Sequence, residues 1–374
     1  MAETPITHDP IYNTVDRDDF LALIEVGRYA ERTNAFDSII SATEDHFWDP
    51  TDAAYIDFEA AKAIDLDHET IMPREFTVEL SCAVADRLDE RQRIRLANQS
   101  TRFMISSLLH GEQGAMSLSA SLCQIMRDPG AQEYAANQTR EEARHVAAFS
   151  RYIQIRFGTP LEAGPTLAGL MSGLVSSPYV YQKLVGMQML IEGLAMGAFA
   201  TLYARTRDPL LRRLVQLVMS DEAFHHKFGK IWADRTMPKL DEEEHARVED
   251  WAASTFQKLL FNLVNSEQKQ QIYREFGLDW QWVRASVLEA FTDSDRRKGM
   301  LESTNIFRVL IKTLLKAGII TDRTKAVYAQ WVDMRELALE PDEVVGTDLA
   351  EATTEELRAI NKTRKKIVHP LRAN

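Results

Sequence analysis

Between residues 112 and 225 the chain carries one short pattern twice, and the second copy follows the first at an offset of eighty residues. Each copy has a lone glutamate, then an Arg-Asp-Pro turn, then a Glu-x-x-His segment beyond that turn. The repeated acidic and imidazole residues are Glu112, Glu142 and His145 in the first copy and Glu192, Glu222 and His225 in the second. Four carboxylates and two imidazoles form the ligand set of a dimetal site inside a four-helix bundle.

The spacing within each copy predicts that these residues meet at one level. Sixteen residues separate Glu112 from Asp128 in the turn, and fourteen separate Asp128 from Glu142. At a rise of about 1.5 Å per residue, both helical arms of such a hairpin are roughly 21 to 24 Å long, so the two glutamates face each other. The second copy has the same two counts. The i, i+3 spacing of Glu-x-x-His places both side chains on one helix face.

Helix-breaking residues divide this region into four expected helices and one crossover. Asp128-Pro129-Gly130 and Asp208-Pro209 mark two turns, and a stretch rich in glycine and proline marks the crossover. The expected helices cover residues 90–126, 131–157, 179–205 and 210–236, with the crossover at 158–178.

The flanking sequence also has helical periodicity, so we expect one all-α domain over residues 1–374, with the bundle at 85–235 and additional N- and C-terminal helices. Residues 1–16 resemble an irregular arm, and 51–75 a short helix or an extended cover, with a packed loop as the plainer interpretation. Further helices are expected at 18–45, 242–276, 305–315 and 324–337. The polar tail, 340–374, should contain a helix opened by a capping box at Thr353.

The ligand types indicate the chemistry of the predicted site. Four carboxylates neutralise two divalent cations and bridge them, and oxygen-rich ligation with a few imidazoles favours iron or manganese over zinc. Glu141 and Asp221 precede the glutamates of the two Glu-x-x-His segments. We expect each to accept the ring N–H of the histidine on the other hairpin and so to fix its tautomer. The alternative interpretation is that both are ordinary solvent-facing acids.

A single Glu-x-x-His occurs often by chance, and a buried glutamate also occurs in ion pairs. Here the lone glutamates of both copies lie in largely apolar runs, and an unpaired buried carboxylate would be costly. Other histidines carry weaker signals: His226 is expected beside the site or at the surface, and His46, His68 and His245 in packing or solvent positions. Five small residues indicate either a substrate tunnel or close helix packing: Ala115, Gly193, Ala195, Gly197 and Ala198.

Composition excludes several classes of function. A formal net charge of −12 argues against a general nucleic-acid binder, which needs a basic face. The apolar run at 185–201 is interrupted by Glu192, so no membrane span is expected. The N-terminus has no signal-like apolar core, and only Cys82 and Cys123 are present. We therefore expect a reduced, cytoplasmic protein.

With these motifs, residues 85–235 resemble the ferritin-like di-iron carboxylate superfamily. The segment from Glu141 to His145 is similar to the motif of acyl carrier protein desaturases and bacterial multicomponent monooxygenases. Its pairing with Asp221 and Glu222 is similar to the ribonucleotide reductase small subunit. The resemblance implies that the six repeated residues are both metal ligands and the catalytic centre. It also implies two iron ions, with a manganese–iron pair as the alternative, and O2 as cosubstrate.

Two positions depart from subgroups of this superfamily. Radical-bearing reductase subunits commonly have a tyrosine seven residues after the first motif glutamate, where this chain has Phe149, and the C-terminal residues 370–374 lack a tyrosine. Some relatives combine a phenylalanine there with a manganese–iron pair. Arylamine N-oxygenases carry an extra histidine where this chain has Val218. Both subgroups are therefore disfavoured, while related N-oxygenating and C–C cleaving oxidases stay open.

Three functions follow as hypotheses. The first is an O2-activating non-heme di-iron oxygenase or oxidase acting on a small, largely apolar metabolite, either amine-linked or carrier-linked. The second is a ligand-binding oxidase or radical-generating subunit with a mixed metal pair, and the third is iron storage. We expect an electron donor such as a ferredoxin or reductase, and a homodimer. A basic cluster at Lys362, Arg364, Lys365 and Lys366 is either a solvated terminus or a docking point for an acidic protein.

Overall fold

In a computed structural model, the chain is described over residues 10–262, 266–299, 306–340 and 346–363. Every regular element within these ranges is a helix, and the only β-type contact there is an isolated bridge between Thr14 and Met126. The all-α fold class is therefore confirmed. Residues 1–9, most of the expected N-terminal arm, lie outside the described residues.

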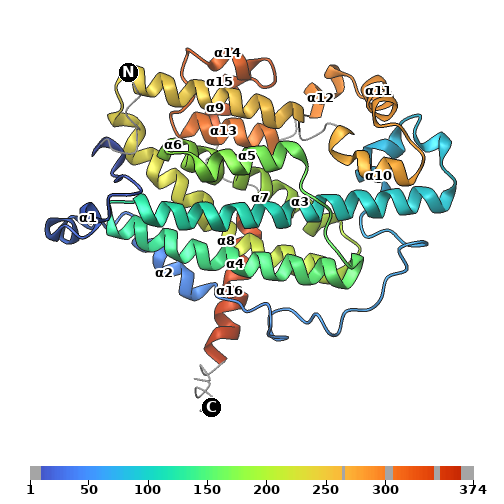
Figure 1. The fold of residues 1–374 in the computed structure, drawn as a ribbon, viewed down its shortest axis with the longest axis horizontal. Helices are drawn as coiled ribbons and strands as arrows, with labels where there is room; N and C mark the ends of the chain where they lie inside the picture. The colour runs from blue at the N-terminus through green and yellow to red at the C-terminus, as the bar shows by residue number, and fades with distance from the viewer. Residues whose placement is uncertain (1–9, 263–265, 300–305, 341–345, 364–374) are drawn as a thin grey trace.

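Three of the four expected long helices form within two residues of their predicted bounds: α3 (Glu90–Ile125), α4 (Pro129–Phe157) and α8 (Pro209–Thr236). The remaining one is a continuous helical rod made of α6 (Val180–Lys183), a π-helical segment (Leu184–Ile191) and α7 (Glu192–Arg205). Helix α3 packs along α4, α7 packs along α8, and α4 contacts α8 (Figure 1).

The two Arg-Asp-Pro turns act identically at the start of α4 and α8. Asp128 accepts a hydrogen bond from the Gly130 amide at 2.8 Å, and Asp208 accepts one from the Leu210 amide at 3.0 Å. The following proline occupies the first helical turn, where its missing N–H costs nothing. Equal turns give the two hairpins equal arms.

The expected helix at 18–45 is wrong. The chain instead forms α1 (Phe20–Leu23), a 3₁₀ segment (Val26–Glu31) and α2 (Asp37–Asp45). Phe20 and Val26 are exposed, so no apolar face holds one long helix together. The buried Arg28 guanidinium instead donates to the carbonyls of Leu23 at 3.0 Å and Arg127 at 2.7 Å, which fixes the chain against the first Arg-Asp-Pro turn.

The crossover at 158–178 is not only a loop, because it contains α5 (Pro165–Ser176). Pro165 is suited to a first helical position, and Met171 and Leu174 bury their side chains on the inner face, where α5 packs on α3. A Cβ at Gly169 or Gly173 would meet nothing within 4 Å. The glycines that suggested a loop therefore lie on the open side of a helix.

Residues 51–75 carry no helix before the short 3₁₀ turn Arg74–Phe76, so the short helix offered for this segment is wrong and the packed loop is the interpretation that fits. Further 3₁₀ turns cover Pro10–Tyr12, Val78–Ser81 and Ala85–Arg87. The predicted helix at 242–276 is divided into α9 (Glu242–Asn262), a 3₁₀ turn (Ser266–Lys269) and α10 (Gln270–Glu275), and a 3₁₀ turn at Met237–Lys239 precedes it. The helix predicted at 324–337 is also divided. The remaining C-terminal helices are α11 (Trp280–Ala290), α12 (Asp293–Gly299), α13 (Ile306–Lys316), α14 (Lys325–Ala329), α15 (Met334–Leu339) and α16 (Thr347–Thr363).

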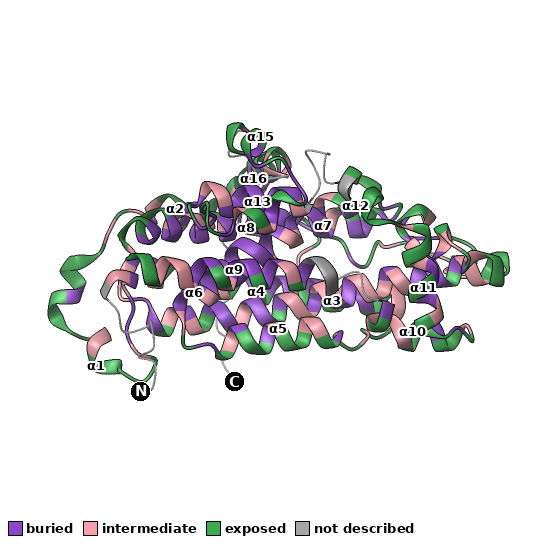
Figure 2. Cartoon of the chain, turned by 90° about the horizontal axis from the view of Figure 1, so that it is seen from above, coloured by how far each residue is buried: buried purple, intermediate pink, exposed green. Residues whose placement is uncertain are grey.

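Helix α13 packs on α7, and α16 packs on α8. Figure 2 shows buried positions concentrated on the central helices α4 and α8, with exposed positions toward α1 and α15. The outer helices therefore cover the second hairpin, while parts of α3 and α4 stay at the surface (Figure 1).

The capping box predicted at Thr353 is wrong. Helix α16 begins at Thr347, and the Thr353 hydroxyl donates to the Leu349 carbonyl at 2.7 Å, inside the helix. Leu357 is fully buried, so this part of the polar tail belongs to the core. Of the basic cluster, Lys362 lies in α16, while Arg364, Lys365 and Lys366 lie outside the described residues, as do residues 370–374.

One helical stretch, Val180–Arg205, is long and apolar enough to cross a membrane by length and composition alone. However, 67% of its apolar window is buried inside the protein, and Glu192 lies within it. This stretch is therefore a core helix of the fold described here.

Candidate metal centre

The six repeated acidic and imidazole residues come together from four helical segments. Glu112 lies on α3, Glu142 and His145 on α4, Glu192 at the start of α7, and Glu222 and His225 on α8. All six are buried, and none is more than 6% exposed. Two overlapping groups have ligand atoms within 4.8 Å of one another: Glu112, Glu142, His145 and Glu222 form one, and Glu142, Glu192 and His225 form the other. These buried groups have the geometry to hold metal ions.

Both histidines direct Nδ1 toward the carboxylates. His145 Nδ1 lies 3.2 Å from an oxygen of each of Glu112, Glu142 and Glu222. His225 Nδ1 lies 3.1 Å from Glu142, 3.3 Å from Glu222 and 3.8 Å from Glu192. Glu142 and Glu222 therefore lie between the two imidazoles, whereas Glu112 and Glu192 each face one of them.

The opposite ring nitrogens point to Glu141 and Asp221. His145 Nε2 lies 2.8 Å from Asp221 Oδ2, and His225 Nε2 lies 2.9 Å from Glu141 Oε2. Both acids are completely buried, so neither is a solvent-facing residue. A carboxylate at Nε2 holds the proton there and leaves the Nδ1 lone pair for a cation.

Three residues around these acids were missed at the level of sequence. His46, expected in an ordinary packing or solvent position, is buried with Nε2 2.9 Å from Glu141 and 3.3 Å from Asp221. The Trp48 indole donates to Asp221 at 2.9 Å, and Arg144 donates to the same oxygen at 2.9 Å. Arg144 could have been noticed because it lies between Glu141 and His145 in the motif. His46 and Trp48 come from the loop after α2, and no local pattern marks them.

Two buried glutamines extend the cluster on one side. Gln138 Nε2 donates to Glu142 at 3.1 Å and to Glu192 at 3.0 Å, and its amide pairs with that of Gln188. In the eighty-residue repeat, Val218 occupies the position equivalent to Gln138, and Leu108 occupies the position equivalent to Gln188. The amide pair therefore breaks the symmetry of the repeat, because it contacts Glu192 and the shared Glu142 but not the lone glutamate of the other half.

The electrostatics of the cluster follow from burial and close opposite charges. Burial raises the pKa of Glu112 and of Glu192 well above that of an ordinary glutamate. For His145 and His225, burial acts against the charged ring, but the surrounding carboxylates outweigh it and raise both pKa values. Protons thus balance part of the negative charge. Because metal ligands must be deprotonated, cation binding would release these protons.

Asp221 differs from the lone glutamates. Burial opposes its ionisation, but Arg144 and the hydrogen-bonded His145 outweigh burial and hold the pKa of this carboxyl far below its usual range. Burial likewise opposes ionisation of Glu142, and His225 and His145 lower its pKa. Asp221 is therefore a fixed negative charge behind His145.

A cavity of about 690 Å³ reaches the cluster between α3 and α7, and Glu112, Glu192 and Glu222 form part of its wall. Of the five small residues that suggested a tunnel, four line it: Ala115, Ala195, Gly197 and Ala198. Gly193 does not, because a Cβ there would lie 2.7 Å from Leu310 on α13. Four of the small residues thus line a cavity, and the fifth allows close helix packing.

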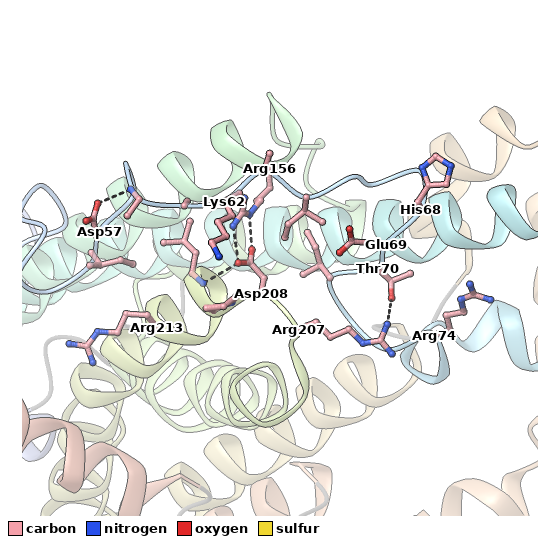
Figure 3. A pocket seen from close by; sticks show the side chains of 18 residues that line it. Asp57, Lys62, His68, Glu69, Thr70, Arg74, Arg156, Arg207, Asp208 and Arg213 are labelled. Atoms are coloured by element: carbon pink, nitrogen blue, oxygen red, sulfur yellow. Dashed lines mark hydrogen bonds and ion pairs between the residues drawn. The ribbon is translucent and has the colours of Figure 1, made fainter.

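A second cavity, of about 650 Å³, lies at the α7–α8 turn and contacts none of the six cluster residues. Figure 3 shows Arg207 directed toward the Thr70 hydroxyl and Arg156 paired with Asp208. Sixteen residues of helix separate Asp208 from Glu192, roughly 24 Å. This cavity is therefore remote from the candidate metal centre.

Three further histidines of the described residues have other partners. His226 is buried with Nδ1 3.0 Å from the Gln188 carbonyl, His245 contacts the Gly318 carbonyl, and His68 pairs with Asp65 at the surface. Phe149 and Val218 are fully buried. No protein-family model, curated protein or solved structure matches this chain.

Proposed function

We propose that this protein is an O2-activating non-heme di-iron oxygenase or oxidase with a ferritin-like four-helix bundle, acting on a small, largely apolar metabolite. The observation that carries the proposal is the convergence of four buried carboxylates on two Nδ1 atoms, with each Nε2 held by a buried acid. The cavity that reaches Glu112, Glu192 and Glu222 provides a place for the substrate.

The donor set fits two iron ions. Glu112 and His145 would help to hold one ion, Glu192 and His225 would help to hold the other, and Glu142 and Glu222, which lie near both histidines, would complete the ligand set. Oxygen-rich ligation with one imidazole per ion suits iron or manganese. When bound, the metal pair supplies electrons for the reduction of O2.

The chain's own residues prepare the site for that chemistry. Asp221 and Glu141 orient the histidines and fix their tautomers. The Arg144 guanidinium pairs with the Asp221 carboxylate. This positive charge offsets the cost of burying Asp221 beside the carboxylates of the cluster. The apolar residues that wall the cavity exclude water from a bound substrate.

Metal content and O2 consumption test the proposal together. Mass spectrometry should find about two metal ions per chain, as the paired ligand set requires. Glu142→Ala and Glu222→Ala should abolish O2 consumption while preserving helical circular dichroism. Glu243→Ala, at an exposed position on α9, is the matched control and should keep full activity. Full turnover in either cluster variant would defeat the assignment, and hundreds of ferric ions per particle would favour iron storage.

One buried tyrosine allows a direct test of the radical-generating alternative. Tyr134, on α4, is completely buried, and its hydroxyl has no hydrogen-bond partner among the described residues. Burial raises the pKa of its phenol well above the usual value, and the charges of His225 and Glu141 also act on it. If this alternative holds, a stable radical signal in electron paramagnetic resonance should appear and vanish in Tyr134→Phe. The absence of a radical signal from the metal-loaded wild-type protein would exclude the radical-generating alternative.

A further inference from the structure

The cavity beside the cluster is elongated along the helices that enclose it. Its lining positions extend from Ser100 to Ala115 on α3 and from Glu192 to Leu202 on α7. Ten residues of α-helix correspond to roughly 15 Å. A ligand that reaches the carboxylates from the far end is therefore a chain rather than a compact ring.

The walls between these ends are mainly apolar. Side chains from four helices form them, including Phe103, Met104, Leu108, Leu167, Leu194 and Phe307. Burial of a hydrocarbon chain against such a surface is favourable in proportion to the area removed from water. The middle of the ligand is therefore expected to be apolar.

Lys269 is the single cation among the described residues that line the cavity. Its Nζ lies 2.8 Å from Glu79 Oε1, and the Tyr273 hydroxyl donates to the same oxygen. A lysine ammonium has three N–H donors, and the other two have no partner among the described residues. The Lys269 side chain is 22% exposed, whereas that of Glu79 is 1% exposed and does not line the cavity.

Polar neighbours make this part of the wall different from the rest. Gln268 donates a hydrogen bond to the Thr166 hydroxyl, and both residues line the cavity beside Lys269. The positive end of the Lys269–Glu79 pair therefore faces the cavity, and the negative end lies behind it. This orientation attracts an anionic group and repels an ammonium group.

We propose that the cavity binds an acidic amphiphile, an apolar chain that ends in a carboxylate, with the carboxylate against Lys269 and the chain directed toward Glu112. That this ligand is a substrate rests on the function proposed above, but its binding does not. The sequence left open an amine-linked metabolite, and the orientation of the Lys269–Glu79 pair favours an acid instead.

Calorimetry with three probes of equal chain length tests this proposal. Decanoate, decylammonium and decanol are titrated separately into the full-length, metal-loaded protein at neutral pH. A charge-assisted hydrogen bond contributes about 1.5 to 3 kcal/mol, so decanoate should bind roughly tenfold or more tightly than decylammonium. Lys269→Met should remove that advantage and leave decanol binding unchanged.

Two further variants serve as controls for the loss of decanoate binding in Lys269→Met. Lys269→Met leaves Glu79 buried without its cation, so the double variant Glu79→Gln, Lys269→Met removes both charges and should show the same loss of decanoate binding. Lys239→Met, at an exposed lysine outside the cavity, should bind decanoate like the wild type. Equal affinity for decylammonium and decanoate, or full decanoate affinity in both Lys269 variants, would overturn the proposal.

This result is separable from the di-iron proposal. If the chain contains no metal but binds decanoate through Lys269, the acid-binding site stands and the oxygenase assignment falls. If two metals and O2 consumption are found but decanoate affinity does not depend on Lys269, the oxygenase assignment stands and the acid-binding site falls.

Discussion

His145 and Asp221 lie on different helices and are 76 residues apart in sequence, yet His145 Nε2 is 2.8 Å from Asp221 Oδ2. His225 and Glu141 make the reciprocal contact at 2.9 Å. Each helical hairpin therefore orients the histidine of the other. These four residues are buried, so we expect substitution of either acid to change metal affinity before other properties.

Asp221→Asn is expected to weaken metal binding at the His145 side. An asparagine accepts a hydrogen bond less strongly than a carboxylate and leaves Arg144 with only the Glu141 carboxylate, at 3.8 Å, as a counter-charge. Loss of such a supporting acid typically lowers metal affinity about 10- to 100-fold. Calorimetric titration with Mn²⁺ should show one weakened step and one near-normal step. Asp234→Asn, at an exposed position on the same helix, should leave both steps unchanged, and wild-type affinity in Asp221→Asn would contradict the prediction.

The glutamine pair makes the two metal positions unequal. Gln138 holds Glu192 and Glu142 by hydrogen bonds, whereas the equivalent positions of the other half are Val218 and Leu108. Replacing Gln138 by Val and Gln188 by Leu copies the apolar half of the repeat. Without its amide donor Glu192 is less well ordered, so we expect the second Mn²⁺ to bind about tenfold more weakly, equivalent to ~1.4 kcal/mol.

The first Mn²⁺ should bind the glutamine double variant nearly normally, because Glu112 and His145 have no contact with the amides and Glu142 keeps its contacts with both histidines. Electron paramagnetic resonance during the titration separates isolated from paired Mn²⁺ and so identifies the affected step. The matched control is Leu108→Met with Val218→Ile, which changes the same positions of the other half without polar groups. Equal losses in both steps would show that the amides support the fold rather than one metal position.

Gly193 and Ala198 both lie on α7 but have different roles, since Gly193 allows close packing and Ala198 lines the cavity. A Cβ at Gly193 would meet Leu310 at 2.7 Å, so Gly193→Ala should lower the free energy of unfolding by about 1 to 3 kcal/mol through overpacking. Ala198 lines the cavity, so Ala198→Leu should occupy that space and weaken decanol binding while leaving stability unchanged or higher. Urea unfolding and calorimetry of both variants check this. The reverse pattern would exclude the assignment of the two roles.

The four long helices around the cluster and the six cluster residues were predictable because their signals are local or periodic. The Arg-Asp-Pro turns set the starts of α4 and α8, and equal counts on both sides set the level of the glutamates. Glu141 and Asp221 were predictable from the same repeat. What limited the prediction was information carried by contacts far apart in sequence, as with His46 and the acids on α4 and α8.

The errors have similar causes. The broken N-terminal helix depends on Arg28 finding carbonyls at Leu23 and Arg127, and the second of these is distant in sequence. The helix in the crossover depends on an inner face that packs against α3. Propensity favoured a loop for that segment, and tertiary packing decided otherwise. The Gln138–Gln188 pair was missed for another reason, since it departs from the repeat that revealed the cluster.

Lys183 provides a test of the core that does not involve the metal centre. Its side chain is buried, and Nζ donates to the Ser121 hydroxyl at 3.0 Å and to the carbonyls of Leu174 and Val175 at 3.2 and 2.7 Å. No carboxylate pairs with it among the described residues, and burial, with a smaller effect of Arg17, lowers its pKa to about 8. The usual lysine value is 10.5, so between these two pH values the unfolded chain binds more protons than the folded one. The contribution of Lys183 to the free energy of unfolding should therefore rise as the pH increases from 8 to 10.5 and stay constant below 8.

Lys183→Met removes this titration. The difference in unfolding free energy between wild type and variant, measured in urea at pH 7.5 and at pH 10, should therefore shift in favour of the wild type at the higher pH. Lys239→Met, at an exposed lysine, should show no such shift. A difference that is the same at both pH values would mean that Lys183 keeps an ordinary pKa in the folded protein.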